Sequence, residues 1–124
     1  MRKFSASVPG KIILTGEHAV VYNHLATALS INLRSTISLS ISDFPYGLTI
    51  TSNGKSEFLL WEEVLKANNT STVSGVISTL LLQVYSEPMN FQFFWESQLP
   101  VGAGLGASAA LCVGVAAVLL VVYK

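Results

Sequence analysis

The glycine-rich stretch PVGAGLGAS at residues 100–108 contains the residues best suited to chemistry. Its glycines at 102, 104 and 106 stand directly before a long apolar segment. If that segment is a helix, its free backbone N–H groups and the positive end of its dipole favour an anion at the loop. Glycines let the backbone approach phosphate oxygens, and the Ser108 hydroxyl suits a phosphate oxygen or a phosphate-bound Mg²⁺. The stretch predicts a phosphate-binding loop, although a close strand-to-helix turn without a ligand accounts for the same glycines.

A membrane span is a further interpretation of this region. The stretch 99–123 has no charged residue, and about 20 apolar residues can cross a bilayer. Gly102 and Gly106 form a GxxxG pair, which is used for helix dimers in membranes. Pro100 and the glycines disfavour helix in the first third, so a continuous helix is expected only from Ala107. About 16 residues then remain, which is short for a span, so a buried helix is favoured over a tail anchor.

A second group of polar residues lies near the start of the chain. The segment PGKIILTGEHAVVY at 9–22 places Lys11, Glu17 and His18 around two glycines. Taken alone, Glu17-His18 is a polar turn and Lys11 a solvated strand residue. Taken with the glycine loop, the segment completes one recognisable pattern.

Composition limits the classes of protein to consider. A chain of 124 residues suggests one domain, long enough to bury a core. Because 51% of the residues are hydrophobic and only 11% are charged, a missing partner segment or a membrane is expected to cover apolar surface. The net charge of zero argues against nucleic-acid binding. The only cysteine, Cys112, is expected to be a small core residue in a reducing compartment, and without a signal peptide the cytoplasm is the default location.

Hydrophobic periodicity predicts the elements that position these residues. Strands are expected at 11–14, 35–42 and 90–95, and at 47–51 and 56–61 around a tight Asn53-Gly54 turn. Residues 24–33 fit strand or helix. Apolar residues recur at helical spacing over 73–84, where Pro88 is expected to end the helix, and a second helix is expected from Ala107 to about Val122. This order predicts an α+β domain with helices packed on one side of the strands.

Three segments together resemble the mevalonate kinases of the GHMP superfamily of small-molecule kinases. They are residues 9–22, SINLRS at 30–35 and LPVGAGLGASAA at 99–110, in this order. The resemblance covers nearly the whole chain and is most specific at 8–35 and 97–112. It implies the GHMP kinase N-terminal domain, of the ribosomal protein S5 domain 2 type, with a mixed or antiparallel sheet. It also implies transfer of the ATP γ-phosphate to the 5-hydroxyl of mevalonate, in isoprenoid and sterol biosynthesis.

The resemblance implies a role for each matching residue. Lys11 lies by the acceptor hydroxyl, where a cation stabilises an alkoxide and the moving phosphoryl group. Glu17 and His18 line the mevalonate side, and Ser97 lies near the nucleotide. The nucleotide phosphate loop comprises Gly102, Ala103, Gly104, Leu105, Gly106, Ala107 and Ser108, with Ser108 as a ligand of Mg²⁺.

Several features depart from the family pattern. Ala107 replaces one of two serines, and the family's catalytic aspartate, metal-binding glutamate and third glycine-rich motif lie further along the chain. Residues 1–124 are therefore expected to be an incomplete N-terminal domain without the C-terminal domain: a fragment, a truncated gene model or a short splice product. Its own activity is doubtful, and a homodimer is expected only of the full-length parent. A non-catalytic product or interaction piece remains the alternative.

Overall fold

The structure is a computed structural model that describes residues 2–16, 22–66, 73–100 and 105–123. In chain order the elements are β1 (Arg2–Thr15), β2 (Thr27–Ser42), β3 (Gly47–Ser52), β4 (Lys55–Leu60), α1 (Trp61–Lys66), α2 (Val73–Leu82), β5 (Asn90–Ser97) and α3 (Ala107–Tyr123). The predicted α+β class is confirmed.

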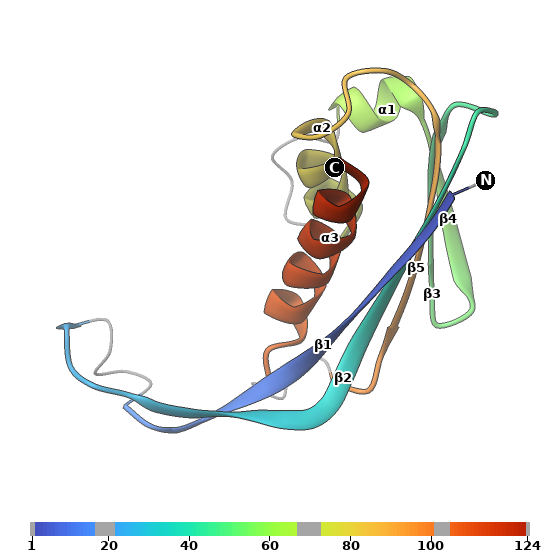
Figure 1. Ribbon diagram of the computed structural model, residues 1–124. Coiled ribbons are helices and arrows are strands. Elements are labelled where there is room, and N and C mark those ends of the chain that lie inside the picture. Colours follow the sequence, from blue (N-terminus) through green and yellow to red (C-terminus); the bar gives the residue numbers. More distant parts are fainter. Residues whose placement is uncertain (1, 17–21, 67–72, 101–104, 124) are drawn as a thin grey trace.

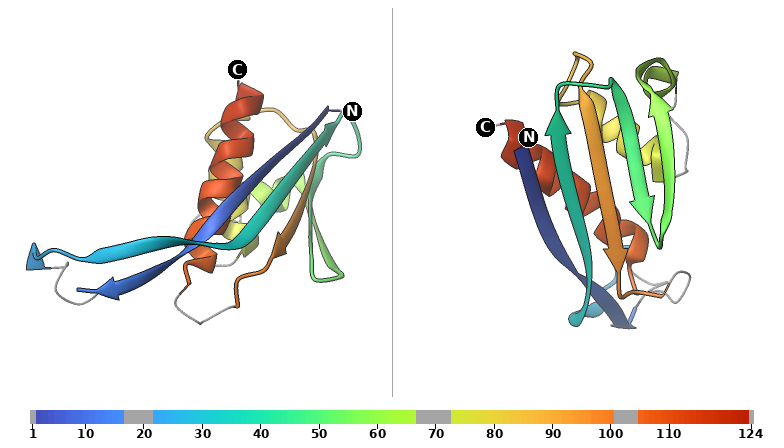
Figure 2. Two further views of the ribbon diagram at one scale, coloured as in Figure 1. Left: turned by 60° about the horizontal axis from the view of Figure 1, so that its bottom comes forward. Right: turned by 90° about the vertical axis from the view of Figure 1, so that its right-hand side faces the viewer.

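The strands form one mixed sheet with the order β1-β2-β5-β3-β4. The β1–β2, β2–β5 and β3–β4 pairs are antiparallel, while β3 and β5 run parallel. The helices lie on one face of this sheet, and the far halves of β1 and β2 extend away from it as a two-stranded arm (Figures 1 and 2). The predicted arrangement of helices on one side is therefore confirmed.

Most of the local predictions agree with the structure. Asn53 and Gly54 have φ angles of 52° and 76°, the positive values that a tight hairpin turn needs at both central residues. Residues 27–33, which fitted helix or strand, belong to β2. The short α1 and the first part of β1 are not among the predicted elements, although Phe4, Ala6 and Val8 alternate with polar residues as in a half-buried strand.

The predicted end of the first long helix is wrong. Helix α2 stops at Leu82, well before Pro88. The backbone N–H groups of Val84 and Tyr85 both donate to the carbonyl oxygen of Leu81, at 3.0 and 2.9 Å. The carbonyl group of Leu81 thus accepts both bonds in a turn that ends the helix. Pro88 is therefore not the cause of the helix end.

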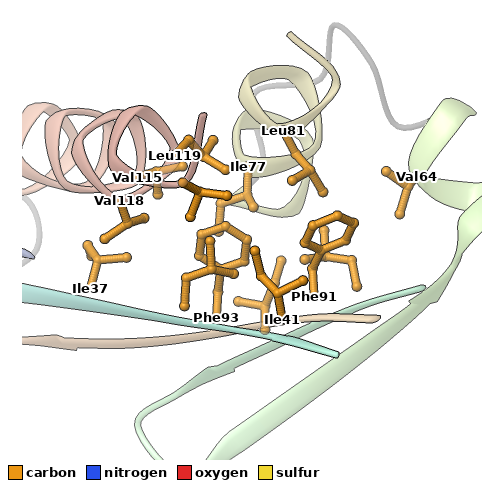
Figure 3. Close-up of a cluster of buried hydrophobic side chains, with 14 of the residues drawn as sticks. Ile37, Ile41, Val64, Ile77, Leu81, Phe91, Phe93, Val115, Val118 and Leu119 are labelled. Atoms are coloured by element: carbon orange, nitrogen blue, oxygen red, sulfur yellow. The ribbon is translucent and has the colours of Figure 1, made fainter. Parts of the chain in front are cut away.

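The hydrophobic core lies between the sheet and the helices α2 and α3 (Figure 3). Alternate residues of the strands point into it, because successive side chains of a strand face opposite sides. Its fully buried members include Ile37, Leu39, Leu48, Phe91, Phe93, Ile77, Leu81, Val115, Val118 and Leu119. Burial of each such side chain stabilises the fold by about 1.5–3 kcal/mol, so this layer fixes α3 against the sheet.

Helix α3 is apolar on both faces but buried on only one. Leu111, Val115 and Leu119 are buried, whereas Val113 and Leu120 are 56% and 61% exposed. Cys112 is also exposed, so the expectation that it lies in the core is wrong. The reason is geometric, because only one side of the helix meets the sheet and α2.

Helix α3 begins at Ala107 and has 17 residues. Among the parts of the chain that the structure describes, no helix combines the length and the apolar character needed to cross a bilayer.

Gly114 allows α3 to approach β2 closely. A Cβ atom built on Gly114 would overlap Cγ1 of Ile37, which is fully buried in β2. The helix backbone therefore lies directly on the side chain of Ile37 at this point. No larger residue fits there without moving the helix or the strand.

We expect Gly114→Ala to lower the free energy of unfolding, measured by urea denaturation. The overlap with Ile37 costs about 1–3 kcal/mol and outweighs the gain of up to about 1 kcal/mol in helix propensity. Val113→Ala on the exposed face is the control and should change little. In an Ile37→Ala background the same Gly114→Ala change should cost nothing further. An equal loss in both backgrounds would contradict the close contact.

Candidate functional site

The structure brings two of the predicted motifs together. The backbone N–H of Lys11 in β1 donates to the carbonyl oxygen of Leu105 at the end of the glycine loop, at 2.9 Å. Segments from opposite ends of the chain thus meet beside the start of α3. Glu17 and His18, and the loop residues Gly102, Ala103 and Gly104, lie outside the described residues.

A break in strand pairing makes this meeting possible. Pro9 pairs with Arg34, but the next residue, Gly10, pairs with Ile31, so β2 contributes two extra residues. Such a bulge bends a strand and redirects it. A Cβ on Gly10 would overlap the side chain of Leu99 and lie 2.8 Å from the oxygen of Leu105. Glycine therefore lets β1 pass against the backbone of the loop.

Arg34 connects Gln98, the residue that follows β5, to the bulge between β1 and β2. Its backbone N–H donates to Oε1 of Gln98 at 3.0 Å, and the Gln98 N–H donates back to the Arg34 oxygen at 2.9 Å. The guanidinium group also donates from Nε to Oγ of Ser7 at 2.6 Å and to the Ser7 carbonyl oxygen at 3.1 Å. Bonds from a charged donor are stronger than neutral ones, so Arg34 links β1, β2 and the residue after β5.

Ser97 holds the turn from β5 into the loop. Its hydroxyl oxygen accepts a bond from Oγ of the fully buried Ser35 at 2.9 Å and from the N–H of Leu99 at 3.1 Å. These contacts give Ser97 a structural task at the entry of the loop. Its expected place near a nucleotide stays a prediction.

The N-terminus of α3 is open to an anion. Gly106 has a φ of +81°, and its carbonyl accepts the first intrahelical bond, from the N–H of Ala110 at 2.8 Å. The N–H groups of Ala107, Ser108 and Ala109 precede that bond and have no acceptor within the helix. Ser108 and Ala109 are exposed. A phosphate group is the kind of ligand that such a helix end binds.

A cavity of about 280 Å³ lies at the carboxyl end of the parallel β3–β5 pair, the edge of the sheet from which the loop departs. It is lined by Ile50, Ser52, Lys55, Ser56, Glu57, Val73 and Trp95. The buried indole N–H of Trp95 has no acceptor among the described residues. Sequence reasoning missed this tryptophan, whose only signal was an aromatic residue shortly before the glycine loop.

The described residues offer little to a metal ion by themselves. No three His, Cys, Asp or Glu side chains among them lie close enough to hold one. The Ser108 hydroxyl, exposed in the first turn of α3, supplies one neutral oxygen. Mg²⁺ prefers six oxygen ligands, so this site fits Mg²⁺ only when the other ligands arrive with a phosphate.

Known proteins are similar to this chain in sequence and in fold. Residues 71–124 match the family described as the GHMP kinases N terminal domain. A mevalonate kinase of Methanothermobacter thermautotrophicus is 35% identical over 113 residues, which cover 90% of this chain and 34% of that protein. A mevalonate kinase of Pyrococcus furiosus is 34% identical over 90% of this chain and 36% of its own length.

A solved structure agrees with these relatives. The crystal structure of the Methanococcus jannaschii mevalonate kinase matches 99% of this chain and 41% of its own, with a TM-score of 0.84 at 27% identity. The resemblance predicted from the motifs is thereby confirmed. The chain spans about a third of the length of the curated relatives that it matches.

We expect Ser97→Ala to lower the free energy of unfolding by about 1–3 kcal/mol, because it leaves the buried Ser35 hydroxyl without its acceptor. Urea denaturation measures this loss. The Ser35→Ala/Ser97→Ala double variant should be more stable than the sum of the single losses predicts. Ser56→Ala, which removes an exposed bond to Thr51, is the matched control. If Ser97→Ala costs no more than this control, the buried bond does not hold the turn.

Proposed function

We propose that this chain, a relative of the GHMP kinases, forms the nucleotide-phosphate side of a mevalonate kinase. Such an enzyme transfers the γ-phosphate of ATP to the 5-hydroxyl of mevalonate, in cytoplasmic isoprenoid synthesis. The observation that carries the proposal is the hydrogen bond from Lys11 to Leu105, which brings the lysine motif to the open end of α3. ATP and mevalonate are the proposed substrates, and dimerisation is proposed only of a longer chain.

The end of α3 suits the phosphates of the nucleotide. Three backbone N–H groups, of Ala107, Ser108 and Ala109, precede the first intrahelical bond, and the helix dipole adds partial positive charge there. The exposed Ser108 hydroxyl would donate to a phosphate oxygen or bind the Mg²⁺ that accompanies ATP. When bound, that ion neutralises charge on the phosphate oxygens.

Lys11 adds a positive charge to this framework. Its backbone is bonded to Leu105, and the stem of its side chain lies along Gly106 at the start of the helix. We propose that its ammonium group binds the phosphoryl group in transfer and the oxygen of the acceptor. Charge develops on these oxygens as the reaction proceeds, so a cation fixed nearby stabilises the transition state more than the ground state.

The cavity beside Trp95 is the proposed place of the nucleotide base. Its wall combines the apolar Ile50 and Val73 with the polar ends of β3 and β4. The indole N–H of Trp95 has no acceptor among the described residues and could donate a hydrogen bond to a ring nitrogen of adenine. The cavity includes Trp95 of β5, which precedes the glycine loop in the chain, and α3 follows that loop.

Two variants in the chain extended to full length test the assignment. Lys11→Met should mainly lower kcat, by about 100-fold or more, because its charge acts in the transition state. Ser108→Ala should raise the KM for Mg²⁺·ATP as well as lower kcat. Lys3→Met, an exposed lysine of the same strand, is the control. A coupled assay measures turnover.

Equal and small effects of the Lys11 and Ser108 variants would show that the site is misplaced. A preference of the full-length protein for galactose or homoserine would refute mevalonate as the substrate.

We expect residues 1–124 alone to show no measurable mevalonate kinase activity and at most weak ATP binding. Within the described residues, no cluster of carboxylates is present to hold the metal or orient the acceptor. The chain should also self-associate, because Leu25 and Leu120 are 96% and 61% exposed. Light scattering and a coupled assay on the same fractions check both points. A monomeric preparation that phosphorylates mevalonate above background would refute them.

A further inference from the structure

The side chain of Lys11 runs through the space beside Gly106 that a larger residue would fill. A Cβ atom built on Gly106 would lie 3.1 Å from Cγ and 3.3 Å from Cε of Lys11, closer than ordinary van der Waals contact. The methylene groups of Lys11 therefore pass close to the backbone of Gly106, where a side chain would crowd them. The stem leaves β1 at a residue whose own N–H is bonded to Leu105, the neighbour of Gly106 in the chain.

These contacts define where the side chain of Lys11 begins and where its methylene groups run. The hydrogen bond to Leu105 holds the main chain of Lys11, and the bare Cα of Gly106 leaves room for the methylene groups. Gly106 also supplies the carbonyl that starts α3. The same residue thus lies beside the methylene groups of Lys11 and at the start of the helix.

We infer that Gly106 is a positioning residue for Lys11, which it directs across the N-terminus of α3 so that the ammonium group and the helix N–H groups bind the same phosphate. The inference rests on the proposed function. It assigns to this glycine a task beyond its positive φ, since the absence of a side chain matters as much as the backbone conformation.

Gly54 provides a control for the positive φ of Gly106 without a crowded side-chain position. Its φ of +76° is close to the +81° of Gly106, so alanine meets the same backbone strain at both positions. A Cβ on Gly54, however, would have nothing within 4 Å. Gly54→Ala therefore controls for the cost of a positive φ to the fold, and the Lys11→Ala background separates strain at the helix end from the overlap with Lys11.

The test uses the chain extended to full length and tripolyphosphate as the probe, followed by NMR at the Ser108 amide and the Lys11 ε-methylene signals. Both signals should shift and saturate in the wild-type chain. In Gly106→Ala the Lys11 response should be lost and the apparent Kd should rise about fivefold, whereas Gly54→Ala should match the wild type. Gly106→Asn serves if the alanine variant does not fold, because asparagine tolerates positive φ better while still carrying a Cβ.

A background without the lysine stem provides the decisive comparison. In Lys11→Ala, the further change Gly106→Ala should leave the apparent Kd at the Ser108 amide unchanged, because Gly106 then has no lysine to direct. An equal loss of affinity in both backgrounds would overturn the inference and leave the phosphate site intact. If neither signal of the wild-type chain responds to tripolyphosphate, the proposed function fails, and the inference with it.

Discussion

The hydrogen bond between the Lys11 N–H and the Leu105 carbonyl is the contact on which the site depends. It joins the first strand to the loop before the last helix, two segments that the sheet alone would leave apart. β2 bulges opposite Pro9 and Gly10, which shifts its pairing with β1 there, and Gly10 leaves room for the backbones of β1 and the loop to meet. Lys11 reaches the helix end only because each of these conditions holds.

Packing far from the site determines where that helix end lies. α3 packs on β2 through Gly114 and Ile37, and its buried face covers β1 and β2. This packing holds the first turn of α3 in place relative to the sheet. Arg34 and Ser97 secure the entry of the loop from the side of the sheet. Core packing and loop chemistry are therefore parts of one arrangement.

The features that the sequence predicts correctly are those with local causes. The Asn53-Gly54 turn and the start of α3 at Ala107 both follow from residue types within a few positions. The bulge opposite Gly10 and the position of Trp95 beside the cavity could not be predicted, because both depend on strands that pair across the chain. Cys112 was misplaced for a similar reason, since an apolar helix does not reveal which face the sheet covers.

The contact between Lys11 and Leu105 also determines the order in which parts of the chain can fold during synthesis. The β1–β2 hairpin joins segments close in sequence and can form while the chain is still growing, since short loops close at low entropic cost. Leu105 leaves the ribosome long afterwards, so the lysine motif has no docking partner until most of the chain has been made. During that interval the core-facing side chains of β2, such as Ile37, also lack the helix α3 that later covers them, which makes nascent chains a target for chaperones.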